Sequence, residues 1–183
     1  MYGLVNQALQ GLISEQYGIE KWNIVKKKAG IEIDYFVSNE PYEDSITFDL
    51  IANASEILNV SSAQILHSFG GYWILRTSRE KYGDLMKAGG SNFLEFMMNL
   101  PNFHSRIMLI YPKLSPPEFM MDKKSDSELI MHYYSSRDGL SDFVLGLIEG
   151  LAEMFETKIT IKLISSEKTD NWHDTFSINI LNH

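Results

Sequence analysis

The spacing of apolar residues changes about two thirds of the way along this chain, and this change constrains the fold more than any other feature. Up to about residue 111, apolar side chains recur at helical intervals, as at Val5, Leu9 and Ile13. From Phe119 onward, short segments alternate apolar and polar residues as strands do, with one helical pattern at Leu140–Phe155 between them. The order strand, strand, helix, strand, strand predicts an α+β protein: a mostly helical N-terminal part, and a C-terminal four-stranded antiparallel sheet packed on helices.

Two features of the helical part interrupt otherwise regular patterns. Gly70 and Gly71 lie inside the helix that Ser61 caps, where each glycine costs about 1 kcal/mol relative to alanine. The pair therefore indicates a close approach of another backbone or of a ligand. Pro101 lies inside the helix that starts at Ser91, and it predicts a kink because proline lacks the backbone N–H that a helix interior uses.

Composition and charge exclude several classes of protein. A length of 183 residues fits one domain or two packed subdomains, and a formal net charge of -8 argues against nucleic acid, whose phosphates need a basic face. With no cysteine, the chain has neither disulfides nor thiolate metal ligands. No apolar run is long enough to span a bilayer and the N-terminus has no basic leader, so we expect a cytoplasmic protein without membrane insertion.

Polar side chains gather on one face at the end of the predicted strand that begins at Glu128. Side chains alternate along a strand, so Tyr133, Ser135 and Arg137 share one face, which is apolar further upstream. Two hydroxyl donors and a guanidinium suit the carboxylates of a flat apolar ligand. The same pattern also fits an ordinary strand end with its arginine in solvent.

His104 interrupts an apolar stripe on the helix that starts at Ser91. Such a histidine is either a buried residue bonded to the backbone or a metal ligand. Together with the Tyr, Ser and Arg face, it suits an apolar disc with a central metal and two carboxylates at one edge, which is the shape of haem. The sequence contains no zinc-hydrolase histidine pair, phosphate loop or nucleophile elbow, so nothing argues for an enzyme.

The whole chain resembles haem nitric oxide/oxygen binding (H-NOX) domains, the family that includes the haem domain of soluble guanylate cyclase. It is most similar to the small stand-alone bacterial members, particularly those of cyanobacteria. The resemblance rests on Tyr133-x-Ser135-x-Arg137 together with the upstream His104. Further matching segments are Met1–Asn6, Asn102–His104, Tyr111–Pro112, Pro116–Pro117 and Val144–Gly150.

This resemblance implies a single domain over residues 1–183, with a helical subdomain up to about residue 60 and a haem-anchoring subdomain from about residue 61. Haem b (iron protoporphyrin IX) would be buried between them. His104 takes the position of the iron ligand, and Tyr133, Ser135 and Arg137 those of the propionate anchors. Pro117 matches the proline that presses on the porphyrin and bends it. The other pocket residues would be Val5, Leu9, Trp73, Phe143 and Leu147.

The choice of gas depends on one position of the pocket. Oxygen-binding members of the family place a tyrosine hydroxyl there, whereas this chain has Phe143, which cannot donate a hydrogen bond. Nitric oxide binds ferrous haem tightly without such a donor. We therefore expect a sensor that binds nitric oxide and carbon monoxide and excludes oxygen. The indole N–H of Trp73 is the other donor to consider.

The family's mechanism implies that nitric oxide weakens the His104–iron bond and thereby shifts one subdomain against the other. The signalling partner that responds to this shift would be a separate protein, such as a histidine kinase or a cyclic-nucleotide signalling enzyme. Three alternatives stay open: an oxygen sensor of the same fold, a non-haem module that binds an apolar carboxylate ligand, and a haem-dependent enzyme. The last would need polar acid–base residues in the pocket.

Overall fold

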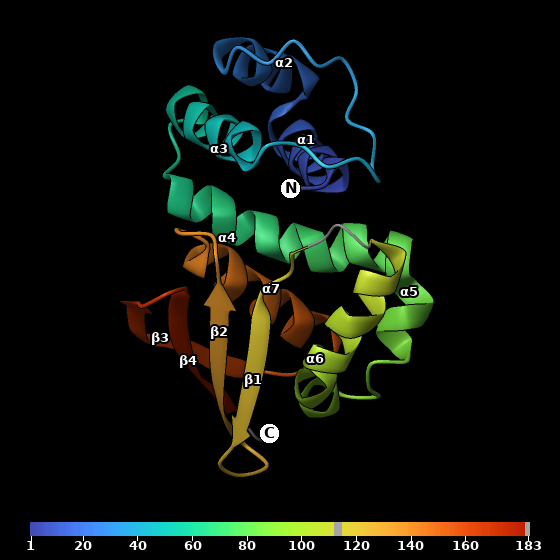
Figure 1. Cartoon of the computed structure of the whole chain (residues 1–183), viewed down its shortest axis with the longest axis vertical. Coiled ribbons are helices and arrows are strands. Elements are labelled where there is room, and N and C mark those ends of the chain that lie inside the picture. Colours follow the sequence, from blue (N-terminus) through green and yellow to red (C-terminus); the bar gives the residue numbers. More distant parts are fainter. Residues whose placement is uncertain (112–114, 182–183) are drawn as a thin grey trace.

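The computed structural model describes residues 1–111 and 115–181, and it has the expected α+β architecture. The helices are α1 (Gly3–Tyr17), α2 (Ile19–Lys28), α3 (Asp44–Leu58), α4 (Ser62–Tyr72), the π-helix η1 (Trp73–Ser78), α5 (Arg79–Lys87), α6 (Phe93–Ile110) and α7 (Ser141–Met154). The strands are β1 (Glu118–Lys123), β2 (Glu128–Ser135), β3 (Ile159–Lys168) and β4 (Trp172–Ile180). In Figure 1, α1 to α3 form one end, α4 crosses the middle, and α7 lies between α4 and the sheet.

The four strands form one antiparallel sheet in the order β1-β2-β4-β3, which confirms the sheet predicted from the alternating patterns. In β2, the side chains of Leu129, Met131 and Tyr133 are buried and face the core, while the residues between them are half-buried. Ser135, at the end of β2, is also buried on the core side. The strand therefore directs its polar end toward the same side as its apolar residues.

Two apolar cores lie on either side of α4. The first joins α1, α2 and α3 and includes Ile65, Leu66 and Phe69 of α4. The second lies between η1, α5, α6, α7 and the sheet. Trp73 packs against both cores. The proposed subdomain boundary near residue 60 stays a prediction, and the first core continues beyond it into α4.

Glycines allow α4 and α7 to cross at backbone contact. A Cβ atom on Gly70 would lie 2.2 Å from the carbonyl oxygen of Phe143, and one on Gly146 would lie 1.9 Å from the carbonyl oxygen of His67. Both distances are too short for any side chain, so these positions require glycine. The neighbouring Gly71 is different, because its nearest contact is the Gly146 oxygen at 3.9 Å. The predicted close approach is thus found at Gly70.

Helix α6 runs through Pro101 without ending, with the proline ring on an exposed side. The kink expected there stays a prediction. Asn92 caps the start of α6 by accepting a hydrogen bond from the backbone N–H of Glu95, which positions the helix that carries His104. No helix within the described residues is long and apolar enough to cross a membrane.

The glycine crossing can be tested by two alanine variants on the same helix. Gly70→Ala should lower the free energy of unfolding by about 2 kcal/mol or more, because its methyl group meets the α7 backbone. Gly71→Ala is the matched control and should raise stability by up to about 1 kcal/mol through its better helix propensity. Urea unfolding of both variants measures the difference. Equal stability of the two would contradict the crossing.

Candidate functional site

A cavity of about 230 Å³ lies where the start of α1, the α4–η1 junction, α6, α7 and the end of β2 meet. Most of its walls are apolar side chains from both cores, including Phe69, Phe119 and Phe143. The polar lining residues come from several elements: Tyr2, Thr47, Ser78, Tyr82, His104, Tyr111, Ser115, Tyr133, Ser135 and Arg137. A largely apolar space that polar groups also line is typical of a site for a small molecule or cofactor.

Nine of the ten site residues predicted from the sequence line this cavity: Val5, Trp73, His104, Pro117, Tyr133, Ser135, Arg137, Phe143 and Leu147. Leu9 is fully buried in the first core and is not among the lining residues. The residues of α1 that reach the cavity are those at its beginning, such as Leu4 and Val5. Leu9 lies one turn further along, among the side chains of the first core.

His104 is half-buried on α6, between the rings of Phe103 and Phe119. Its Nδ1 lies 3.1 Å from the backbone carbonyl oxygen of Leu100. A carbonyl can only accept, so Nδ1 carries the proton and Nε2 keeps a free electron pair. Burial lowers the pKa of His104, although the hydrogen bond to Leu100 opposes this. A neutral imidazole held through its other nitrogen is the form that binds a metal.

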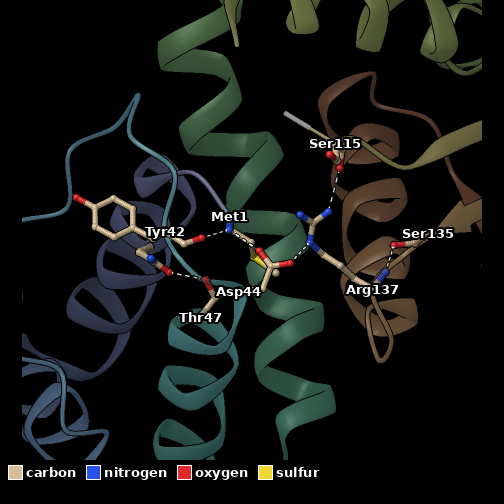
Figure 2. A network of polar contacts seen from close by, with 8 residues as sticks. Met1, Tyr42, Asp44, Thr47, Ser115, Ser135 and Arg137 are labelled. Carbon is tan, nitrogen blue, oxygen red and sulfur yellow. Dashed lines mark hydrogen bonds and ion pairs between the residues drawn. The ribbon is translucent and has the colours of Figure 1, made fainter. Parts of the chain in front are cut away.

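The Tyr133, Ser135 and Arg137 group forms the polar wall of the cavity. Burial raises the pKa of Tyr133, although its hydrogen bond with Ser135 lowers it, so the phenol stays a donor. The backbone N–H of Arg137 donates to Ser135 Oγ at 3.0 Å, which fixes the chain just after β2 (Figure 2). The predicted shared face is therefore present, with two hydroxyls and one guanidinium at one end of an apolar space.

Asp44 holds the Arg137 guanidinium from the other side, and the strand pattern gave no indication of it. Arg137 Nε donates to Asp44 Oδ2 at 2.6 Å, and Nη1 donates to the carbonyl oxygen of Ser115 at 3.0 Å. The N-terminal ammonium of Met1 also pairs with Asp44 (Figure 2). This network joins the beginning of α3 and the N-terminus to the end of β2. Because 93 residues separate Asp44 from Arg137, no local pattern could have revealed it.

The electrostatic state of Asp44 follows from these partners. Burial raises the pKa of its carboxyl group, but the hydrogen bonds and charges of the N-terminus and Arg137 outweigh burial and hold it below the ordinary value of 3.8. Asp44 is therefore ionised at neutral pH, and it neutralises two cations next to the cavity.

These donors fit haem better than a bare metal ion. Within residues 1–111 and 115–181, no three His, Cys, Asp or Glu side chains come together to hold a metal. A single imidazole suits a metal that brings its other ligands with it, as haem iron does. The apolar walls suit a porphyrin face, and the hydroxyls and guanidinium suit its two carboxylates.

Comparison with known proteins settles the family. The family model described as Haem-NO-binding matches residues 2–163. The chain belongs to the Haem-NO-binding family. It is an H-NOX domain, the haem-binding gas-sensor type that is related to soluble guanylate cyclases. The family resemblance inferred from the motifs is therefore confirmed.

Two curated relatives are guanylate cyclases of Caenorhabditis elegans. Soluble guanylate cyclase gcy-31 is 27% identical over 168 residues, which are 91% of this chain and 24% of the relative. Soluble guanylate cyclase gcy-33 is 30% identical over 155 residues, 85% of this chain and 16% of the relative. The chain thus spans about a quarter or less of the length of these cyclases.

Solved structures share the fold over the whole chain. An H-NOX protein from S. oneidensis in the Fe(II)NO state is 22% identical, with a TM-score of 0.89 and complete coverage of both chains. An oxygen-binding H-NOX domain, solved as its oxygen complex, is 21% identical, with a TM-score of 0.85 and coverage of 100% and 96%. Because both a nitric oxide complex and an oxygen complex have this fold, the fold alone does not choose the gas.

The Asp44–Arg137 contact predicts a specific dependence of stability on pH. Asp44→Asn should lower the free energy of unfolding by about 1 kcal/mol at neutral pH, since the pair is only partly shielded from water. The lowered pKa means that this contribution exists above the unfolded value of 3.8 and is lost as the pH falls through the folded value. The stability difference between wild type and variant, measured by urea unfolding, should therefore shrink in acid.

The control for this prediction is Asp126→Asn. Asp126 pairs with Lys123 in solvent, so its loss should leave stability at neutral pH almost unchanged. A wild-type-minus-variant difference for Asp44 that stays constant down to the acid transition would contradict the prediction.

Proposed function

We propose that this protein is a haem-based gas sensor that binds nitric oxide and carbon monoxide at ferrous haem b and excludes oxygen. The observation that carries the proposal is the state of His104. Its Nδ1 is hydrogen-bonded to the backbone of its own helix, and its ring lines an apolar cavity that also contains Tyr133, Ser135 and Arg137. One neutral metal-binding nitrogen and one carboxylate-binding wall thus share a cavity.

The residues of the cavity have separate roles in this proposal. His104 would bind the iron, Tyr133, Ser135 and Arg137 would hold the propionates, and Pro117 would press on the porphyrin. When bound, ferrous haem would supply the iron that takes up the gas, and His104 would be the residue whose hold on that iron changes.

Release of His104 would free α6 to move, and an aromatic contact at the end of α6 supports the transmission of that movement. Tyr111, which follows α6, accepts a hydrogen bond at 2.9 Å from the hydroxyl of Tyr82 on α5. The Tyr111 ring also packs edge-on against Tyr2, with centroids 5.0 Å apart, at the beginning of α1. A shift of α6 would therefore reach the N-terminal helices and bias them between two arrangements.

The preference for nitric oxide rests on the donors that the pocket lacks. Phe143 lines the cavity and packs on Phe69 with centroids 5.0 Å apart, and neither ring can donate a hydrogen bond. Trp73 also lines the cavity, edge-on to Phe69 at 6.2 Å. The edge-on packing supports the interpretation of Trp73 as an aromatic that narrows the pocket rather than as a donor to bound oxygen.

The partner is proposed to be a separate signalling protein in the cytoplasm, such as a histidine kinase or a cyclic-nucleotide signalling enzyme. Two curated relatives are named soluble guanylate cyclases, which supports a signalling role for this chain. Their matched segment is only a part of each chain. Movement of the N-terminal helices against the sheet would change the outer surface that such a partner reads.

The haem assignment can be tested with the iron ligand. His104→Gly should abolish stable haem binding, seen as loss of Soret absorption, and free imidazole should restore it by replacing the missing ring. His67→Ala is the control, because it removes a half-exposed imidazole that pairs with Glu149 on the surface. Normal haem retention by His104→Gly without imidazole would contradict the assignment. A wild-type chain that gains no Soret band with added haem would favour a non-haem module for an apolar carboxylate.

The gas preference can be tested at Phe143. The reduced, haem-loaded wild type should bind nitric oxide and carbon monoxide but show no persistent oxygen complex in air. Phe143→Tyr adds a donor to the pocket and should slow oxygen dissociation about tenfold, the effect of one hydrogen bond. Stopped-flow absorption measures both. A persistent oxygen complex in the wild type that Trp73→Phe removes would overturn oxygen exclusion and identify the indole as the donor.

A further inference from the structure

The sheet face opposite α7 carries a second group of imidazoles, which is distinct from His104 in the cavity. In β2, His132 and Tyr134 point away from the core residues on either side of them. In β4, His173 and Thr175 alternate with Asp174 and Phe176 of the opposite face; His173 is half-buried, and Thr175 is itself buried. β2 and β4 are the two inner strands of the sheet, whereas α7 lies on the other face (Figure 1).

Three ligand-type atoms from these strands form a small triangle. His132 Nδ1 lies 3.0 Å from His173 Nε2, and Thr175 Oγ1 lies 3.3 Å from His173 Nε2 and 3.5 Å from His132 Nδ1. The strand register explains the grouping, since Thr175 lies directly opposite His132. Tyr134 stacks on the His173 ring with centroids 4.3 Å apart and planes 12° apart, which holds that imidazole in place.

The separation of the two nitrogens matches two ligands of one metal ion. Zinc binds histidine nitrogens at about 2.0–2.1 Å, so two such nitrogens at angles of about 90–109° are about 2.9–3.4 Å apart. The observed 3.0 Å lies within that range. Without a metal, the ring N–H of one neutral imidazole donates a hydrogen bond to the other ring. A metal would replace that proton if the donating ring changed to its other tautomer, so no net proton need be released.

The surroundings of the pair are those of an open site. No third His, Cys, Asp or Glu within the described residues completes a metal cluster, so water would fill the remaining positions. Glu167 lies opposite His173 in the β3–β4 register, and Glu118 lies opposite Tyr134 in the β1–β2 register. Both glutamates thus belong to the strands next to β2 and β4, and the chain's net charge of -8 also favours cations.

We propose that His132 and His173, with Thr175 beside them, form a surface site for a divalent transition metal that prefers imidazole, such as Cu²⁺ or Zn²⁺. Among these ions Cu²⁺ binds nitrogen ligands most strongly. The site is separate from the haem cavity, because none of the three residues lines it. The proposal is therefore independent of the proposed gas-sensing function.

The test uses the full-length, haem-loaded protein after removal of free metal with a chelator. One equivalent of Cu²⁺ should bind, with an electron paramagnetic resonance spectrum that shows coupling to two imidazole nitrogens. His132→Gln and His173→Gln should each weaken binding by more than about 100-fold, beyond the 10–100-fold cost of losing an outer partner of a metal ligand. His67→Gln is the matched control, since it removes a half-exposed imidazole elsewhere, and should bind Cu²⁺ like the wild type.

Equal Cu²⁺ affinity in the wild type and in both variants would overturn the proposal, as would a spectrum with no nitrogen coupling. A second measurement needs no substitution in the sheet. In ¹⁵N-histidine spectra of the wild type, Zn²⁺ should shift the ring nitrogens of His132 and His173 and leave those of His67 unchanged. Unchanged His132 and His173 signals at saturating Zn²⁺ would also overturn it.

Discussion

The glycine crossing of α4 and α7 is the contact on which the rest of this structure depends. Gly70 and Gly146 let the two helix backbones touch, at a point that lies between the two apolar cores. Phe143 and Leu147, on either side of Gly146, and Trp73, just beyond Gly70, all line the cavity. A side chain at either glycine would force the helices apart and change the shape of the pocket. Close packing here therefore determines where a ligand can lie.

Two polar arrangements then orient the His104 and Arg137 side chains that line the cavity. His104 is oriented by its own helix, through the Leu100 carbonyl, and needs no distant partner. Arg137 is oriented by Asp44 and the N-terminus, which lie on the other side of the molecule's middle helix. The nitrogen proposed to bind iron thus belongs to α6, while the wall proposed to bind carboxylates is tied to α3 through Asp44. In the proposed sensor, a movement of the N-terminal helices against the sheet would therefore have to alter the Asp44–Arg137 contact.

Local patterns predicted most of the elements, because the helices and strands are amphipathic, although only α4 and α6 have a side-chain cap among the helices described. The hairpin of β1 and β2 and the helix α7 were expected within a few residues of their observed limits. Strand alternation placed Tyr133 and Ser135 on the cavity side of β2, whereas Arg137 lies beyond the end of that strand, and the roles of all three stay predictions. Leu9 shows the limit of this reasoning: helical spacing puts it on the same stripe as Val5 but does not say where the cavity ends.

The sequence by itself determined the fold class and the family, and it predicted which residues would bind iron and carboxylates, because these inferences depend on residue type and short-range spacing. Only the tertiary structure revealed Asp44 as the partner of Arg137, and it alone brought His132 and His173 together across two strands. Both contacts join residues far apart in the chain, at 93 and 41 positions. Such pairs depend on how whole elements pack, and packing is decided by shape and by glycine contacts that no local period encodes.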